Sequence, residues 1–173
     1  MAVKTLSDGF MQDMATAEAW KSLSGSFNWD EIMLEKYQDK VDWSEISKNE
    51  NIRWTIPMMK KFQKRINWDK LSEYISKDSL TESMIEVFQN QWNWHELSDN
   101  RSITLTHGLL DKYADKWDWE MIINRHDGIF YRVGIDFYEK YKSYIPVGKL
   151  LNTNLWEGIV EQQKILLIDE ITA

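Results

Sequence analysis

An Asn or Asp followed directly by Trp occurs five times in this chain of 173 residues, and no other feature constrains the fold as much. These dipeptides are Asn28-Trp29, Asp42-Trp43, Asn67-Trp68, Asn93-Trp94 and Asp118-Trp119. From Trp43 onward the tryptophans recur at intervals of 25, 26 and 25 residues. A fixed period of this length is typical of repeat proteins, in which each unit packs only on its neighbours.

The residues after each of these dipeptides predict a short helix, which we call helix A of the repeat. Asn67 is a favoured N-cap residue, and a helix that begins at Trp68 places Leu71 and Ile75 on one face. Glu45 stands three residues after Asp42 and predicts a capping box, in which the Glu side chain binds the N–H of the cap residue. We expect helix A to have about two turns.

A second helix, helix B, is predicted from apolar residues at helical spacing around a recurring aromatic residue. The aromatic residues are Tyr37, Phe62, Phe88, Tyr113 and Tyr141. Apolar residues stand eight and four positions before each of them and four positions after, so they share one helical face. We expect about three to four turns. Seven positions before the aromatic residue are the expected N-caps Asp30, Thr55, Thr81, Thr106 and Gly134.

Together the two helices predict an all-α fold, a solenoid of tandem helical hairpins with about five units. The clearest repeats span residues 28–145, and the terminal units are degenerate. Trp20 begins a helix A pattern without an Asx cap, and Pro146 occupies the last helix A position. Because no linker rich in Pro, Gly or Ser divides the sequence, we expect a single domain over residues 1–173.

The Trp-x-x-Leu-Ser frame of helix A, as in residues 68–72 and 94–98, resembles a shortened tetratricopeptide repeat. The likeness is confined to this frame. The period here is 25 to 26 residues, against about 34 in that family, and the small-residue and closing-proline positions of the family are missing. The resemblance implies stacked helical hairpins, and it assigns no ligand and no activity.

Composition excludes several classes of protein. The net charge of -7 argues against a general nucleic-acid binder, which needs a basic surface. The chain contains no Cys, so it has no disulfide and no thiolate metal site. It also has no run of about 18 apolar residues and no signal-peptide core at its start. We therefore expect a cytoplasmic protein with no membrane segment and no cofactor.

The ten tryptophans are either core residues between repeats or a surface that recognises a ligand. Most of them recur at fixed positions of the period, which favours core packing. Trp92 and Trp117 precede Trp94 and Trp119 by two residues, so we expect one ring of each pair to stay partly exposed. Trp156 lies outside the repeat and is also expected to be exposed.

Basic residues recur on helix B, one position before the aromatic residue and three positions after it. Because these positions are four residues apart, we expect them to share one helical face and to form a cationic ridge. The ridge is a candidate surface for an acidic partner protein. Alternatively, the charges only complement the helix dipoles, and this interpretation needs no partner. The candidate partner-binding residues are Lys36, Lys40, Lys61, Arg65, Lys112 and Lys116.

No pattern of catalytic residues is evident, and we expect no enzymatic activity. The histidines, His95, His107 and His126, lie in different repeats, and no glycine-rich phosphate loop is present. The irregular segment 126–128 is the one candidate for a functional loop. The sequence favours a non-enzymatic scaffold that binds another protein, with self-association through the array ends as a further expectation. The alternative is a small acidic inhibitor or immunity-type protein that blocks a basic site on a nuclease or toxin.

Overall fold

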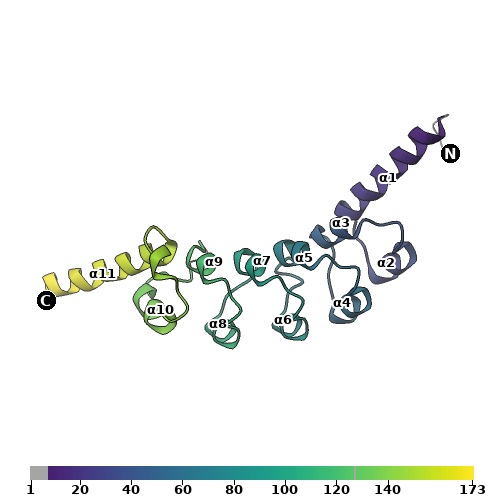
Figure 1. The fold of residues 1–173 in the computed structure, drawn as a ribbon. Coiled ribbons are helices and arrows are strands. Elements are labelled where there is room, and N and C mark those ends of the chain that lie inside the picture. Colours follow the sequence, from purple (N-terminus) through teal and green to yellow (C-terminus); the bar gives the residue numbers. More distant parts are fainter. Residues whose placement is uncertain (1–7, 127) are drawn as a thin grey trace. The chain divides into compact units, whose positions relative to one another are not determined.

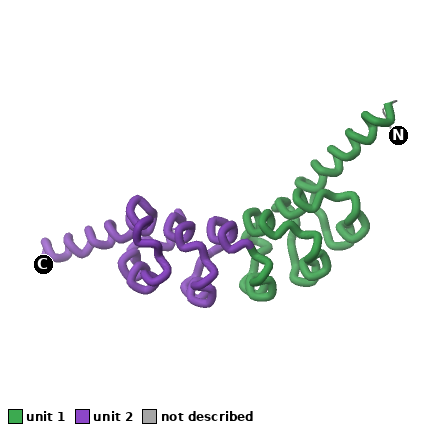
Figure 2. Tube along the Cα trace, viewed as in Figure 1, with its two compact units in different colours: residues 1–92 green, residues 93–173 purple. Residues whose placement is uncertain are grey.

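The computed structural model describes residues 8–126 and 128–173, and within these residues it contains eleven α-helices, one short 3₁₀ helix and no strand (Figure 1). The predicted all-α class is therefore confirmed. The chain divides into two compact units, residues 1–92 and residues 93–173 (Figure 2). None of the described helices is both long enough and apolar enough to cross a lipid bilayer.

Unit 1 begins with one long helix and continues with short ones. Helix α1 covers Gly9–Ser26 and α2 covers Glu31–Tyr37. The remaining helices of the unit are α3 Trp43–Lys48, α4 Ile56–Phe62, α5 Trp68–Tyr74 and α6 Glu82–Val87. Helices α1, α3 and α5 correspond to helix A and pack against one another in that order. Helices α2, α4 and α6 correspond to helix B.

Unit 2 continues the alternation of the two helix types and ends in a long helix. Helices α7 (Trp94–Asp99) and α9 (Trp119–Ile123) correspond to helix A. Helices α8 (His107–Lys112) and α10 (Gly134–Tyr141) correspond to helix B. The 3₁₀ helix η1 (Val147–Lys149) occupies the last helix A position after Pro146. Helix α11 (Asn154–Thr172) packs along α10.

Most predicted N-caps are confirmed. The side chains of Asp42, Asn67, Asn93 and Asp118 accept hydrogen bonds from backbone N–H groups in the first turn of α3, α5, α7 and α9. Asp30, Thr55, Thr81 and Thr106 cap α2, α4, α6 and α8 in the same way. The prediction for Gly134 is wrong, because α10 starts at Gly134 and its N-cap, Val133, has no side-chain hydrogen bond to offer.

The helix B segments are shorter than predicted. They contain six to eight residues, about two turns rather than three to four. The chain leaves the helix at the aromatic residue and forms a tight turn, in which Lys40 N–H donates to the Tyr37 carbonyl. In unit 1 this turn brings Asp42, the N-cap of the next helix A, into contact with Ser24 of the preceding helix A.

A buried serine joins consecutive A helices. Ser24 Oγ donates to the carbonyl of Trp20 at 2.7 Å and accepts from the backbone N–H of Asp42 at 2.9 Å. Ser47 makes the same pair of bonds in unit 1, and Ser98 makes it in unit 2. The capping box predicted for Glu45 is therefore wrong in its second half. The N–H of Asp42 binds Ser24, and the Glu45 carboxylate pairs with Lys48.

The tryptophans are core residues, as predicted. Five are buried, namely Trp29, Trp54, Trp92, Trp117 and Trp119, and the other five are half-buried. Trp94 is the partly exposed member of its pair, as expected, but Trp117 and Trp119 are both buried. Trp156 is half-buried rather than exposed. Trp92 and Trp117 can be buried because their indole N–H groups donate to carbonyls of α6 and α8.

Buried polar side chains also donate hydrogen bonds to carbonyl groups at and after the C-terminal ends of two A helices. In unit 1 the side-chain amide of Asn49 donates to the carbonyls of Ser24 and Phe27 after α1. In unit 2 the position equivalent to Asn49 holds Arg125, which is 2% exposed. Its guanidinium donates to the carbonyls of Ser98, Asn100 and Ile103 at 2.7 to 3.1 Å. A cation suits this place, because the last carbonyls of a helix carry partial negative charge.

Candidate partner-binding surfaces

The six basic residues of the predicted ridge occupy two kinds of position. Lys36, Lys61 and Lys112 lie in the last turn of α2, α4 and α8. Lys40, Arg65 and Lys116 lie in the turns that follow these helices, because helix B is shorter than expected. The late-helix position of the first three suits the helix dipole, as the second interpretation of these charges requires.

Lys61 and Arg65 bind carboxylates of the same unit. Lys61 Nζ lies 2.8 Å from Glu35 and 3.1 Å from Glu31, so it ties α4 to α2. Arg65 lies 2.8 Å from Asp39. The hydrogen bonds that Lys61 donates to Glu35 and Glu31 raise the pKa of Lys61 above its ordinary value. This part of the ridge presents mixed charge rather than bare cations.

Lys36, Lys40 and Lys116 lie over aromatic rings. Lys36 Nζ is 5.1 Å from the ring centre of Tyr37, and Lys40 Nζ is 5.6 Å from that of Trp20. Lys116 covers Trp94 in unit 2 at 5.7 Å. Lys36 and Lys40 have no carboxylate partner among the described residues, and both are exposed. Both are therefore available to meet an acidic partner. Lys112 lies 5.5 Å from the ring of Tyr113.

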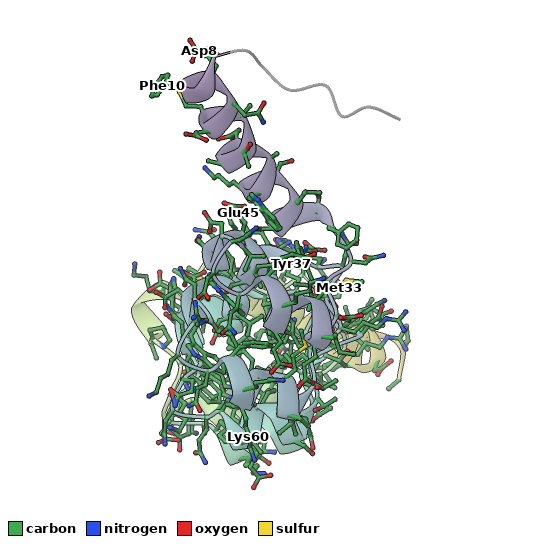
Figure 3. The ribbon with its side chains drawn as sticks, turned by 90° about the vertical axis from the view of Figure 1, so that its right-hand side faces the viewer. Asp8, Phe10, Met33, Tyr37, Glu45 and Lys60 are labelled. Atoms are coloured by element: carbon green, nitrogen blue, oxygen red, sulfur yellow. The ribbon has the colours of Figure 1, made fainter. Side chains whose placement is uncertain are left out.

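An apolar hollow of about 530 Å³ lies between α1 and α2; Lys36 lines it, and Lys40 lies over Trp20, one of its lining residues. We call it the first-pair groove and define it by Trp20, Phe27, Ile32, Met33 and Tyr37, with Lys36 at its edge. Figure 3 shows Met33 and Tyr37 near the base of α1, with Phe10 at the far end of that helix. The side chain of Ile32 is 78% exposed and that of Phe27 is 45% exposed.

The first-pair groove is a place where the repeat is left uncovered. Met33 of α2 is 36% exposed, whereas Met58 and Met84, at the same position of α4 and α6, are 3% and 5% exposed. This groove was not predicted from the sequence. A signal was present, because Ile32 stands where the other repeats have Pro57, Ser83, Gly108 and Asp136. A large apolar residue occurs at this position only in the first repeat.

A second hollow in unit 1 is polar and mostly acidic. Its volume is about 660 Å³, and the carboxylates of Asp30, Glu31, Glu50 and Asp78 line it together with Arg53. A basic partner is the complementary ligand for such a lining.

The histidines do not form a metal site, and no group of three or more potential metal ligands occurs in residues 8–126 and 128–173. His95 Nδ1 lies 2.6 Å from Asp118 Oδ2 in unit 2. This hydrogen bond, against a smaller effect of desolvation, raises the pKa of His95 above its ordinary value. Burial acts to raise the pKa of Asp118, but the hydrogen bonds from His95 and the Met121 N–H outweigh it and lower that pKa.

The other two histidines also lie in unit 2. His107 Nδ1 lies 3.1 Å from the Tyr141 hydroxyl, which itself donates to Asp111. His126 is exposed and borders a small hollow with Phe130 and Gly158, whereas Asp127 of the candidate loop lies outside the described residues. Comparison of the chain with protein-family models, curated proteins and solved structures found no match.

Proposed function

We propose that the chain is a solenoid of about five helix pairs and acts as a non-enzymatic, cytoplasmic scaffold that binds another protein. One contact supports the repeat count. A helix A tryptophan meets a helix B aromatic ring in each proposed pair, with ring centres 5.0 to 5.4 Å apart. Solenoids commonly use their extended surfaces to bind proteins.

The observation that carries the proposal is the first-pair groove. Here Ile32, Met33 and Phe27 remain exposed in a hollow with a lysine at its edge. Exposed apolar surface edged by polar residues marks an interaction site.

The chemistry of the groove favours an amphipathic helix with acidic residues as its occupant. An apolar helix face can cover Trp20, Ile32 and Met33 in the manner of helix-in-groove recognition. Carboxylates beside that face would meet Lys36 and Lys40, which have no carboxylate partner among the described residues of the chain. Charge pairing at the rim would speed association and select acidic partners.

The test uses a fluorescein-labelled amphipathic peptide with Leu on one face and Glu on the other, and a matched peptide with Lys in place of Glu. Fluorescence anisotropy should detect binding of the acidic peptide only. Lys36→Glu with Lys40→Glu should weaken this binding about tenfold, since two exposed charge pairs are reversed. The matched control is Lys60→Glu with Lys64→Glu, which changes the net charge equally at exposed positions of the same unit.

An equal loss of affinity in both double variants would show that only the net charge matters, and the groove would be excluded as the site. Absence of binding by the acidic peptide would count against the proposed function itself. Ile32→Glu supplies a third measurement. Because Ile32 is largely exposed, this change should abolish peptide binding while leaving the fold intact.

The acidic hollow of unit 1 supports one alternative function, an inhibitor that blocks a basic site on a nuclease or toxin. Its carboxylates, which include Glu50 and Asp78, would meet basic residues of the target. In that case the Lys peptide should bind instead of the Glu peptide. Glu50→Lys with Asp78→Lys should then abolish binding, and Lys36→Glu with Lys40→Glu should not.

A further inference from the structure

We infer that the occupant of the first-pair groove is helix α11 of a second copy of this chain. The inference rests on the proposed function, because it uses the same groove and names the partner. Three features support it: the half-buried tryptophan of α1 that lines the groove, the apolar stripe of α11 and the charges beside both.

In the next two repeats of unit 1, the tryptophan equivalent to Trp20 contacts the turn after the preceding helix B. Trp43 donates its indole N–H to the Gln38 carbonyl after α2, and Trp68 donates to the Gln63 carbonyl after α4. Each of these tryptophans is thus covered by the helix B before it. Trp20 is the equivalent residue of α1. It is half-buried against Trp29 and Tyr37 and lines the groove, and none of the described residues accepts a hydrogen bond from its indole N–H. A helix from another molecule can supply both the apolar cover and an acceptor.

Helix α11 has an unpartnered apolar stripe of the required kind. Its first half is fixed to α10, where Gln162 Oε1 accepts from the Ile135 N–H at 2.7 Å. Beyond this point Leu167, Ile168 and Ile171 are 47%, 58% and 81% exposed. Their spacing of three and four residues places them on one helical face, with Val160 in line. We call these four residues the α11 stripe.

The charges beside the groove and the stripe are complementary. Glu161 and Glu170 flank the α11 stripe at its two edges, and Lys164, which lies within the stripe, is paired with Glu161 at 2.9 Å. Lys36 and Lys40 stand beside the groove without carboxylate partners in the described part of unit 1. An α11 stripe in the groove would place carboxylates near these lysines, and opposite charges would set the orientation of the helix.

The contact joins two different surfaces, so it is heterologous. Each bound copy still has one groove or one stripe available, and further copies can add. Sedimentation velocity of the full chain should therefore show dimers and larger species as the concentration rises. Added salt should weaken the assembly, because exposed charges are screened.

Two variants divide the contact into its halves. Ile32→Glu with Lys36→Glu disables the groove, and Leu167→Lys with Ile171→Lys disables the stripe. All four residues are exposed, so both variants should fold, and circular dichroism checks this. Each variant alone should be monomeric. An equimolar mixture should form a dimer and nothing larger, because only one intact groove and one intact stripe remain. Val87→Glu, at another exposed apolar residue of unit 1, should assemble like the wild type.

Three results would overturn the inference. One is a wild-type chain that stays monomeric at all concentrations. Another is a stripe variant that still dimerises, which would indicate groove-to-groove contact. The third is an assembly that is lost in Phe10→Glu but not in the groove variant, since the exposed start of α1 would then be the contact.

The peptide experiment separates failure of this inference from failure of the proposed function. The receptor in that case is the stripe variant, whose groove is intact and has no competing α11. One outcome is that this variant binds the acidic peptide while the wild type does not self-associate. That result would support the proposed scaffold function and exclude a second copy as the partner. If the peptide does not bind, the groove is not a docking site and both proposals fail.

Discussion

Ser47 Oγ lies 2.9 Å from the backbone nitrogen of Asn67, so one hydroxyl joins the end of α3 to the start of α5. The same hydroxyl donates to the Trp43 carbonyl at 2.7 Å. Because Ser47 is 1% exposed, water has little access to replace either bond. The hydroxyl therefore serves both its own helix and the next pair.

Ser47→Ala should destabilise the chain by about 1–3 kcal/mol, because it leaves the Asn67 N–H without an acceptor. Urea unfolding measures the change as a lower midpoint at constant slope. Ser26→Ala is the matched control, since the Ser26 hydroxyl donates to the Ser22 carbonyl at an exposed position. It should shift stability by less than about 0.5 kcal/mol. Equal effects of the two changes would contradict a linking role for Ser47.

Trp68→Ala should cost about 3–5 kcal/mol in unfolding free energy. The Trp68 ring lies 5.2 Å from both Phe88 and Trp92, and its N–H donates to the Gln63 carbonyl. Removing it opens a cavity between helix pairs. Tyr131→Ala removes an aromatic ring that is 66% exposed and should have little effect. A loss under about 1 kcal/mol for Trp68→Ala would mean that the ring is not part of the core.

Arg125→Met should cost about 3 kcal/mol or more, because three buried carbonyls lose their donor together. Arg125→Lys should restore only part of this, since an ammonium lacks the planar fork that binds several carbonyls at once. Thermal and urea unfolding should rank the chains as wild type, Lys and Met. Arg101→Met at an exposed position is the control and should match the wild type.

Gly134→Ala should detach α11 from α10. A Cβ at residue 134 would lie 2.4 Å from the backbone of Gly158 and Ile159, so the two helices would have to separate. The expected result is faster hydrogen exchange throughout α11, measured by mass spectrometry. Gly148→Ala is the control, since a Cβ there meets no atom within 4 Å. Unchanged exchange in Gly134→Ala would contradict the close packing of these helices.

The pKa of His95 should lie above its ordinary value of 6.5, because Asp118 holds its protonated form. Asp118→Asn should lower that pKa, as measured by NMR titration. Unfolded His95 titrates near 6.5, so the stabilisation is complete below this pH and is lost as pH rises through the raised pKa. The lowered pKa of Asp118 adds stability above pH 3.8 that is lost as pH falls through the lowered value. The same pKa in both chains would mean that the pair does not form in solution.

Capping preferences and helical spacing in the sequence predicted where most helices begin, but they did not predict where the helices end. Asp42 and Thr55 act within three residues of themselves, so their capping roles can be read from sequence. The end of α2 depends on a turn that brings Asp42 to Ser24, a contact across 18 residues. The same contact explains why the capping box of Glu45 failed. The N–H that Glu45 was expected to bind already has a tertiary partner.

The candidate site was predicted only in part. Lys36 and Lys40 were proposed as partner-binding residues from their positions in the repeat; Lys36 lines the first-pair groove, and Lys40 lies over Trp20. The pairing of Lys61 with Glu31 and Glu35 was not foreseen, because it crosses 30 and 26 residues. Charge patterns along one helix do not show which carboxylates the neighbouring helix supplies. The groove was missed because burial of Met33 was inferred from its repeat position rather than from its actual neighbours.

The buried serines also make the length of the chain adjustable in whole repeats. Ser24 and Ser47 offer the same hydroxyl, while Asp42 and Asn67 offer the same backbone N–H and the same kind of cap. Deleting residues 42–66 would join Val41 to Asn67 and let Ser24 bind Asn67 directly. Duplication of the same segment would insert one more pair with every junction bond preserved. Gain or loss of a 25-residue segment in evolution would therefore change how many helix pairs the protein has without requiring a new kind of contact.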